Sequence, residues 1–247
     1  GSWYEFCSTK RLDFDLFTDQ SRFTDDTVCS IAIADALMTG KDFVGKLKYW
    51  CRKYPKAGYG GNFNWWFRQD NPRPYNSWGN GSAMRVSAVG AFAKSTEETL
   101  ALAEESAVVS HNHPEGIKGA QATALAINLA LKGCTKEEIK AQIEAHFGYD
   151  LSRKYIDIQS QYTFDVSCQG SVPEAIIAFL ESSDYESAIR MAVAYGGDAD
   201  TQAAITGGIA AAYYGKIPDH ILKECLSRLP LDMKELIAKF NQVCNNE

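Results

Sequence analysis

The chain has 247 residues, of which 45% are hydrophobic, so it can bury the core of one domain over residues 1–247, with two smaller domains as the alternative. Its formal net charge of −6 argues against general affinity for nucleic acid. The sequence contains no run of about 18 apolar residues, so we expect no membrane-spanning helix. Seven scattered cysteines without a C-x-x-C pair are typical of a reducing compartment. We therefore expect a cytoplasmic protein, with a monomer as the simplest expectation.

Helical signals dominate from residue 24 onward. Apolar residues recur at helical spacing from Val28 to Met38, and Gly40 ends this run. A second helix is expected from Asp42 to about Lys53.

The segment from Tyr54 to Gly81 is expected to be a long irregular loop. It is rich in glycine, asparagine, proline and tryptophan, and a loop of this length in a compact domain is usually functional or disordered. Its aromatic content favours function. A helix from Ala83 to Phe92 should follow.

Capping boxes mark further helix starts. In four places a hydroxyl residue precedes a glutamate by three positions, which satisfies free amides at a helix start. These pairs are Ser95 with Glu98, Thr135 with Glu138, Ser171 with Glu174, and Ser183 with Glu186. Gly133 and Gly196 are expected to end helices, and two last helices fit residues 218–226 and 231–241.

Strand signals are few, and the best of them, Tyr162 to Val166, is equally compatible with an extended loop. We therefore predict an all-α fold, a compact bundle of many short helices. The small residues from Ala203 to Ala212 indicate a helix packed closely at the centre of this bundle.

Two acidic clusters lie far apart in the sequence, each just before an alanine-rich helix. They read Thr24-Asp25-Asp26-Thr27 and Asp198-Ala199-Asp200-Thr201. If folding joins them, four carboxylates crowd together and need a counter-ion. Mg²⁺, Mn²⁺ and Ca²⁺ prefer such oxygen ligands, whereas neither cluster holds the soft ligands that favour zinc. The alternative is that each cluster is an ordinary helix N-cap.

Two other stretches are candidates for ligand binding. The glycine-rich turn Gly79-Asn80-Gly81-Ser82 precedes a predicted helix, where backbone amides favour an anionic phosphate, although Ser82 is equally typical of a cap. His111 and His113 are interpreted as part of a polar loop near the ligand, with a pair of hydrogen-bonded loop histidines as the alternative.

Taken together, these residues resemble the ADP-ribosylglycohydrolase family, which includes the glycohydrolase that reactivates dinitrogenase reductase and the J-type crystallins. The resemblance follows the family's order and spans nearly the whole chain. It rests on residues 1–6 (GSWYEF), 23–27 (FTDDT), 79–85 (GNGSAMR), 110–116 (SHNHPEG) and 196–201 (GGDADT). Family members usually have a short apolar helix before the first stretch, so this chain is expected to lack that helix or to be a shortened member.

The resemblance implies an all-α bundle with a central site for two Mg²⁺ ions, with Mn²⁺ as an alternative. The implied ligands are Thr24, Asp25, Asp26, Asp198, Asp200 and Thr201. Glu5 falls where the family has a glutamate close to the metals and the scissile bond. The implied contacts to ADP-ribose are Gly58, Gly60, Asn80, Gly81, Ser82, His111 and His113. Aromatic residues that could stack an adenine, or simply fill the core, are Trp65, Trp66, Trp78 and Tyr149.

The activity implied is hydrolysis of an N- or O-glycosidic bond at the anomeric carbon of an ADP-ribosyl group. Asp26 or Asp198 is the expected base, and Glu5 is expected to position the substrate or to pass on a proton. The expected substrate is an ADP-ribosylated protein or small-molecule conjugate, and a nucleic acid only if it is ADP-ribosylated. The alternatives are a non-catalytic, crystallin-like relative that binds ADP-ribose, and a magnesium-dependent nucleotide phosphohydrolase.

Overall fold

Helices make up almost all regular structure in the computed structural model, which describes residues 2–245 without the side chain of Asn245. Gly1 of the first family-like stretch and the last two residues of the predicted domain lie outside the described residues. None of the described helices is long and apolar enough to cross a membrane. The helices are α1 (Asp25–Met38), α2 (Phe43–Lys53), α3 (Gly61–Trp66), the 3₁₀ turn η1 (Asn80–Ser82), α4 (Ser87–Phe92), α5 (Thr96–Val108), α6 (Pro114–Leu131), α7 (Lys136–Phe147), α8 (Tyr155–Gln161), α9 (Cys168–Glu181), α10 (Tyr185–Ala194), α11 (Ala199–Tyr214), α12 (Asp219–Ser227) and α13 (Leu231–Asn245).

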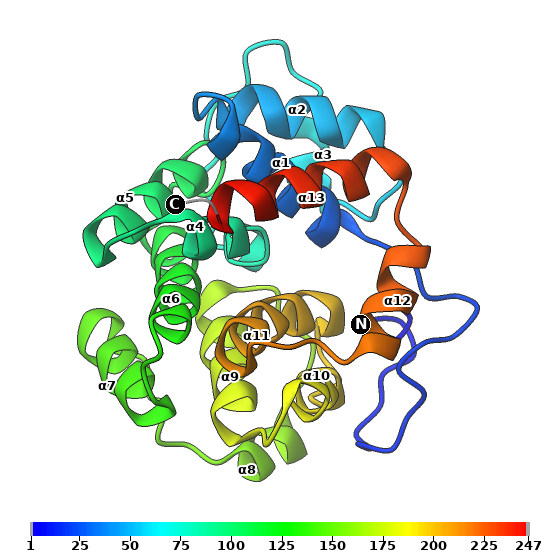
Figure 1. Ribbon diagram of the computed structural model, residues 1–247, viewed down its shortest axis with the longest axis vertical. Helices are drawn as coiled ribbons and strands as arrows, with labels where there is room; N and C mark the ends of the chain where they lie inside the picture. The colour runs from blue at the N-terminus through cyan, green and yellow to red at the C-terminus, as the bar shows by residue number, and fades with distance from the viewer. Residues whose placement is uncertain (1, 246–247) are drawn as a thin grey trace.

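The prediction of an all-α fold is confirmed, because the described residues form no strand and only one isolated bridge, between Gly79 and Ser167. Figure 1 shows α1, α2 and α13 on one side of the molecule and α9, α10 and α11 on the other. Helix α6 joins the two halves, since Ala120 and Ala124 belong to the first apolar cluster and Leu125 and Leu129 to the second.

Small residues allow the central helices to approach one another closely. A Cβ added at Gly90 of α4 would lie 2.7 Å from the backbone oxygen of Ala124 in α6. Helix α11, predicted as a central helix from its small residues, packs against α6, α9 and α10. These contacts fix α11 relative to α6, and therefore fix where α11 begins.

The loop prediction for residues 54–81 was wrong in part, because α3 lies inside it. Its six residues include glycine and asparagine, which are poor helix formers, so local propensity does not reveal it. Phe63 and Trp66 lie one turn apart and are buried, with their rings stacked at a centroid distance of 5.3 Å. Packing of these two rings therefore stabilises a helix that the local sequence disfavours.

The helix predicted from Ala83 to Phe92 begins later, at Ser87. The chain first forms η1, in which the amide N–H groups of Ala83 and Met84 both donate to the Asn80 carbonyl. The expectation that an α-helix starts directly after Ser82 was therefore wrong, and the glycine turn leads into η1 instead.

The capping predictions hold where the hydroxyl residue lies at a true helix start. Thr135 and Glu138 form a reciprocal capping box on α7, and the Ser95 side chain accepts from the Glu98 amide on α5. The prediction was wrong at Ser171, which lies inside α9, because Ser167 caps this helix and Pro173 is accommodated within it. It was also displaced at α10, where the capping box pairs Asp184 with Ser187.

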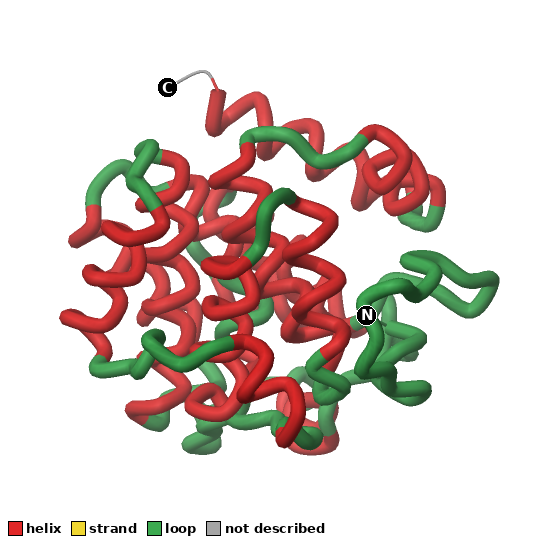
Figure 2. Tube along the Cα trace, turned by 90° about the horizontal axis from the view of Figure 1, so that it is seen from below, coloured by secondary structure: helices red, strands yellow, loops and turns green. Residues whose placement is uncertain are grey.

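Residues 2–24 form a helix-free loop, which is seen at the N-terminal side of the molecule in Figure 2. Basic side chains from distant elements hold it by donating to its backbone carbonyls. Arg190 of α10 donates to Leu12 and Phe14, and Arg228 donates to Ser21. This anchoring places the start of the loop, which carries Glu5, against the starts of α1 and α11.

Candidate active site

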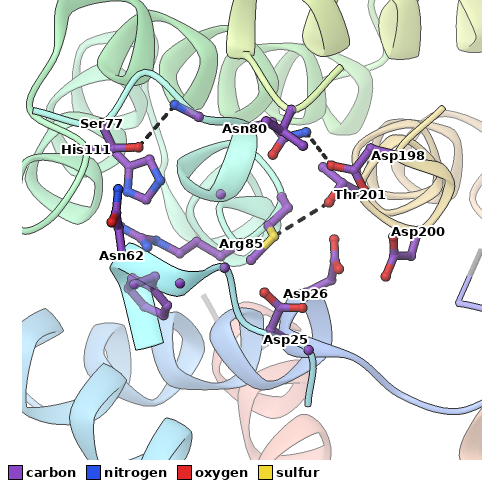
Figure 3. A pocket seen from close by; sticks show the side chains of 18 of the residues that line it. Asp25, Asp26, Asn62, Ser77, Asn80, Arg85, His111, Asp198, Asp200 and Thr201 are labelled. Carbon is purple, nitrogen blue, oxygen red and sulfur yellow. Dashed lines mark hydrogen bonds between the residues drawn. The ribbon is translucent and has the colours of Figure 1, made fainter. Parts of the chain in front are cut away.

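The starts of α1 and α11 open into one cavity with a volume of about 420 Å³ (Figure 3). Pockets of this size are typical of small-molecule sites. The chain brings to it segments that are remote in sequence: the N-terminal loop, the loop before α3, η1 and the loop before α6, which carries His111. The predicted site residues that line this cavity are Glu5, Asp25, Asp26, Gly58, Gly60, Asn80, Gly81, His111, Asp198, Asp200 and Thr201.

The acidic cluster on α1 does not serve as a side-chain cap. Thr24 occupies the N-cap position but makes no capping hydrogen bond to the helix amides. Its hydroxyl instead donates to Asp26 Oδ2 at 2.9 Å. The other oxygen of Asp26, Oδ1, is buried without a hydrogen-bond partner among the described residues. Thr24 lines an adjoining cavity of about 270 Å³ that shares Asp26 and Asp200 with the first.

The second cluster behaves in the same way. Asp198 occupies the N-cap position of α11 without a capping hydrogen bond from its side chain. Its Oδ2 accepts from the side-chain amide of Asn80 at 2.8 Å, and the same Asn80 amide donates to Ser171 Oγ at 3.1 Å. The Asn80 side chain therefore ties Asp198 to α9 and holds its carboxylate toward the cavity (Figure 3).

Glu5 joins the second cluster from the N-terminal loop. One carboxylate oxygen each from Glu5, Asp198 and Asp200 lie within 4.8 Å of one another, a spacing that a single metal ion could span. Glu5 is half-buried. Its neighbours in the sequence give no sign that it lies beside Asp198 and Asp200, and only the family resemblance indicated it.

The carboxylates in the cavity lie close enough to raise one another's pKa values. Burial, and then the charge of Asp200, raise the pKa of Asp25 and that of Asp198 to about 7. Burial, and then the charges of Asp200 and Asp198, raise the pKa of Glu5 to about 7 as well. Burial and three neighbouring carboxylates hold the pKa of Asp26 well above its usual range. A divalent cation would relieve this repulsion, and the all-oxygen donor set with the unpartnered Asp26 Oδ1 fits Mg²⁺ or Mn²⁺.

Two predicted substrate contacts lie outside the cavity lining. Ser82 is fully buried and its hydroxyl donates to the Gly116 carbonyl at 2.7 Å, which joins η1 to α6. The His113 ring accepts from the Glu115 amide at 3.1 Å and caps α6. His113 is thus a hydrogen-bonded loop histidine, as its alternative interpretation described, whereas Ser82 joins η1 to α6 and is not the helix cap that its alternative described.

None of the four aromatic candidates lines the cavity. Trp66 and Tyr149 are buried in the core, whereas Trp65 and Trp78 are largely exposed. The cavity wall contains Phe164 instead, a residue of the extended segment after α8 that remains 57% exposed. Sequence analysis did not identify Phe164, because an exposed aromatic residue in a loop has no distinguishing pattern.

Sequence analysis also missed Arg85, which lines the cavity floor although it is only 1% exposed. It belongs to one of the family-like stretches, but its position after Met84 in an apolar stretch gives no local sign of a role. The described carboxylates form no ion pair with it.

An all-helical fold with a carboxylate-lined cavity offers the oxygen donors that a hard cation prefers. The family model for ADP-ribosylglycohydrolase matches residues 1–246. The chain therefore belongs to the ADP-ribosylglycohydrolase family, and it is an enzyme that hydrolyses glycosyl bonds.

Individual relatives agree with this family. The chain is similar to ADP-ribosylhydrolase ARH3 of Homo sapiens, with 26% identity over 274 residues that cover 84% of this chain and 76% of the relative. It is 27% identical to the Bos taurus ARH3, covering 84% and 75%. A solved structure titled ADP-ribosylglycohydrolase-related protein complex superposes with a TM-score of 0.70 and 26% identity, covering 90% of this chain and 81% of that one.

Proposed function

We propose that this enzyme hydrolyses the glycosidic bond between the anomeric carbon of ADP-ribose and an acceptor, with two Mg²⁺ or Mn²⁺ ions as cofactors. The observation that carries the proposal is the convergence of the two acidic clusters in one cavity where Asp26 Oδ1 has no partner among the described residues. The proposed ligands are Thr24, Asp25, Asp26, Asp198, Asp200 and Thr201.

When bound, such ions would neutralise the charge of the carboxylates and lower the pKa of a bound water. The protein side chains then have separate tasks. Asp26 or Asp198 accepts the proton of the attacking water as positive charge develops on the ribose ring. Glu5 lies beside Asp198 on a separate loop, where it can orient the scissile bond or pass a proton to the departing acceptor.

Backbone and side-chain groups across the cavity would hold the rest of the substrate. Gly58 has a φ of +106°, which an L-residue rarely adopts, and a Cβ there would lie 3.4 Å from Asp25 Oδ1. Gly60, Gly81 and His111 line the same cavity. We propose that these four residues contact the diphosphate and the adenosine side of ADP-ribose.

The proposed substrates are ADP-ribosylated proteins or small-molecule conjugates, acted on by a monomer in the cytoplasm. The cysteine pattern of the sequence supports that location. The acceptor linkage stays open among arginine, serine, a nucleic-acid base and O-acetyl-ADP-ribose.

The test is release of free ADP-ribose from a panel of these linkages, with and without EDTA. We expect the double variant Asp25→Asn with Asp198→Asn to lose activity on every substrate, and the control Asp219→Asn, an exposed residue of α12, to retain it. Release of AMP or phosphate as the small product would indicate a phosphohydrolase instead. Unchanged ADP-ribose release by the double variant would refute the metal-dependent mechanism.

A further inference from the structure

A buried arginine, Arg85, lines the cavity, and no carboxylate of the described residues forms an ion pair with it. The Arg85 guanidinium donates through Nη2 to the Ser106 carbonyl at 2.8 Å and to Ser110 Oγ at 3.0 Å. It also lies over the Phe63 ring, 5.6 Å from the ring centroid. Placing an unpaired guanidinium here costs desolvation free energy, so its contacts call for a functional explanation.

The serine that Arg85 contacts links it to His111. Ser110 is fully buried, and its Oγ lies 2.8 Å from His111 Nδ1. Arginine can only donate, so Ser110 Oγ accepts from Arg85 and keeps one hydroxyl hydrogen to give away. His111 Nδ1 is the acceptor within reach among the described residues, and a proton on Nδ1 would leave the buried hydroxyl hydrogen without an acceptor. The chain of donors therefore runs from Arg85 through Ser110 to Nδ1.

The other ring nitrogen of His111 faces the cavity. A Cβ added at Gly81 would lie 3.0 Å from His111 Nε2, and one at Gly79 would lie 3.8 Å from it. The rings of Tyr75 and Phe63 flank the imidazole at centroid distances of 5.8 Å and 6.5 Å and hold its plane. Nε2 therefore points along the glycine turn Gly79 to Gly81.

We propose that Arg85 and Ser110 are positioning residues that fix His111 as a neutral imidazole with its proton on Nε2, so that it donates a hydrogen bond to an oxygen of the ADP-ribose diphosphate or ribose. This inference rests on the proposed function for the identity of the ligand. The opposite tautomer would present a lone pair to an anionic substrate and repel it.

The electrostatic environment agrees with this geometry. Burial, and then the positive charge of Arg85, hold the pKa of His111 well below its usual range, so the ring stays neutral at pH 7. Among the described residues, Arg85 is the charged side chain that acts on the His111 ring. Its positive charge favours an anion in this part of the cavity.

The tautomer can be measured without any substrate. The chain has only four histidines, so ¹⁵N-labelled imidazole signals can be assigned with the variant His111→Gln. We expect His111 in the wild type to be protonated on Nε2 and unprotonated on Nδ1 from pH 5.5 to 8. A proton on Nδ1, or an imidazolium at pH 7, would overturn the proposal.

The consequence for binding is tested with two matched variants. Removing the hydroxyl in Ser110→Ala should raise the Kd for ADP-ribose about tenfold and KM similarly, with kcat changed less. The reason is that the hydrogen bond from His111 Nε2 to a charged oxygen of the ligand weakens when the ring is no longer held in one tautomer. Ser110→Thr, which keeps the hydroxyl, should restore the Kd to within about twofold of wild type.

Failure of the two proposals can be told apart. If the tautomer is as expected but Ser110→Ala binds ADP-ribose like wild type, the positioning role is wrong. If wild type binds no ADP-ribose while His111 carries its proton on Nε2, the proposed substrate is wrong and the tautomer assignment stands. Melting temperatures of Ser110→Ala and Ser110→Thr show whether a change in Kd reflects misfolding. If a variant is misfolded, the wild-type ¹⁵N spectrum still decides the tautomer of His111.

Discussion

Replacement of Asp26 by asparagine should stabilise the metal-free enzyme while abolishing its response to Mg²⁺. Asp26 is 6% exposed and faces Asp25, Asp198 and Asp200, and one of its oxygens has no partner among the described residues. Asparagine keeps the size of the side chain and removes its charge. The change therefore relieves repulsion without creating a cavity.

The size of the effect follows from the burial of this carboxylate. A buried carboxylate oxygen without a hydrogen-bond partner, such as Asp26 Oδ1, costs about 1–3 kcal/mol, so Asp26→Asn should recover about that amount at pH 8. For a chain of this length, about 1 kcal/mol corresponds to about 2–4 °C in Tm, which gives a rise of about 2–12 °C in EDTA. Wild type should gain about 2.7 kcal/mol at a Mg²⁺ concentration of about 100 Kd, whereas the variant should gain almost nothing.

Thermal unfolding of both proteins in EDTA and in Mg²⁺ is the assay. Asp35→Asn is the matched control on the same helix, because Asp35 accepts from Lys46 Nζ and from Trp50 Nε1, both at 2.9 Å. We expect this control to lower Tm in both conditions and to keep the wild-type Mg²⁺ increment. A lower Tm for Asp26→Asn in EDTA, or an unchanged Mg²⁺ increment, would contradict the view that this carboxylate is kept for a cation.

Three further outcomes are expected. The pKa values of Glu5, Asp25 and Asp198 in the folded enzyme are raised to about 7, so these carboxyl groups favour folding below their unfolded pKa and lose that contribution as pH rises through 7. The Tm of the metal-free enzyme should therefore fall from pH 5 to pH 8. Saturating Mg²⁺ should reduce this fall. Asn80→Ala removes the donor to Asp198 and should weaken Mg²⁺ binding by about tenfold in calorimetry, with little change in Tm in EDTA. Gly90→Ala should lower Tm by several degrees, because the new Cβ would meet Ile127 at 2.7 Å and overpacking costs about 1–3 kcal/mol, whereas Gly61→Ala, with open space around it, should not.

Much of the helical architecture could be predicted because the sequence carries local signals for it. The helix predicted from Asp42 is capped by that residue, whose side chain accepts from the Gly45 amide. Gly133 and Gly196 follow helix ends with φ of +79° and +70°, as their positions suggested. Such signals act within a few residues of the chain, so periodicity and capping preferences are sufficient to find them.

The features that could not be predicted depend on contacts between remote segments. Helix α3 exists because Phe63 and Trp66 pack into the core, and Ser82 is a structural residue because the Gly116 carbonyl happens to face it. Arg85 acquires its partners only when η1 folds against the end of α5. A sequence pattern contains the residues but not these pairings.

The two acidic clusters occupy helix starts, yet their side chains leave the helix amides unsatisfied by capping. Both helices therefore forgo about 0.5–2 kcal/mol of capping stabilisation each. The α6, α9 and α10 contacts of α11 supply the packing that keeps it helical without this cap. The same packing fixes Asp198 through Asn80 and Ser171, so the rigidity of the core is what holds repelling carboxylates close enough to share a cation. Loosening this support, for example by Asn80→Ala, should therefore affect cation affinity before it affects folding.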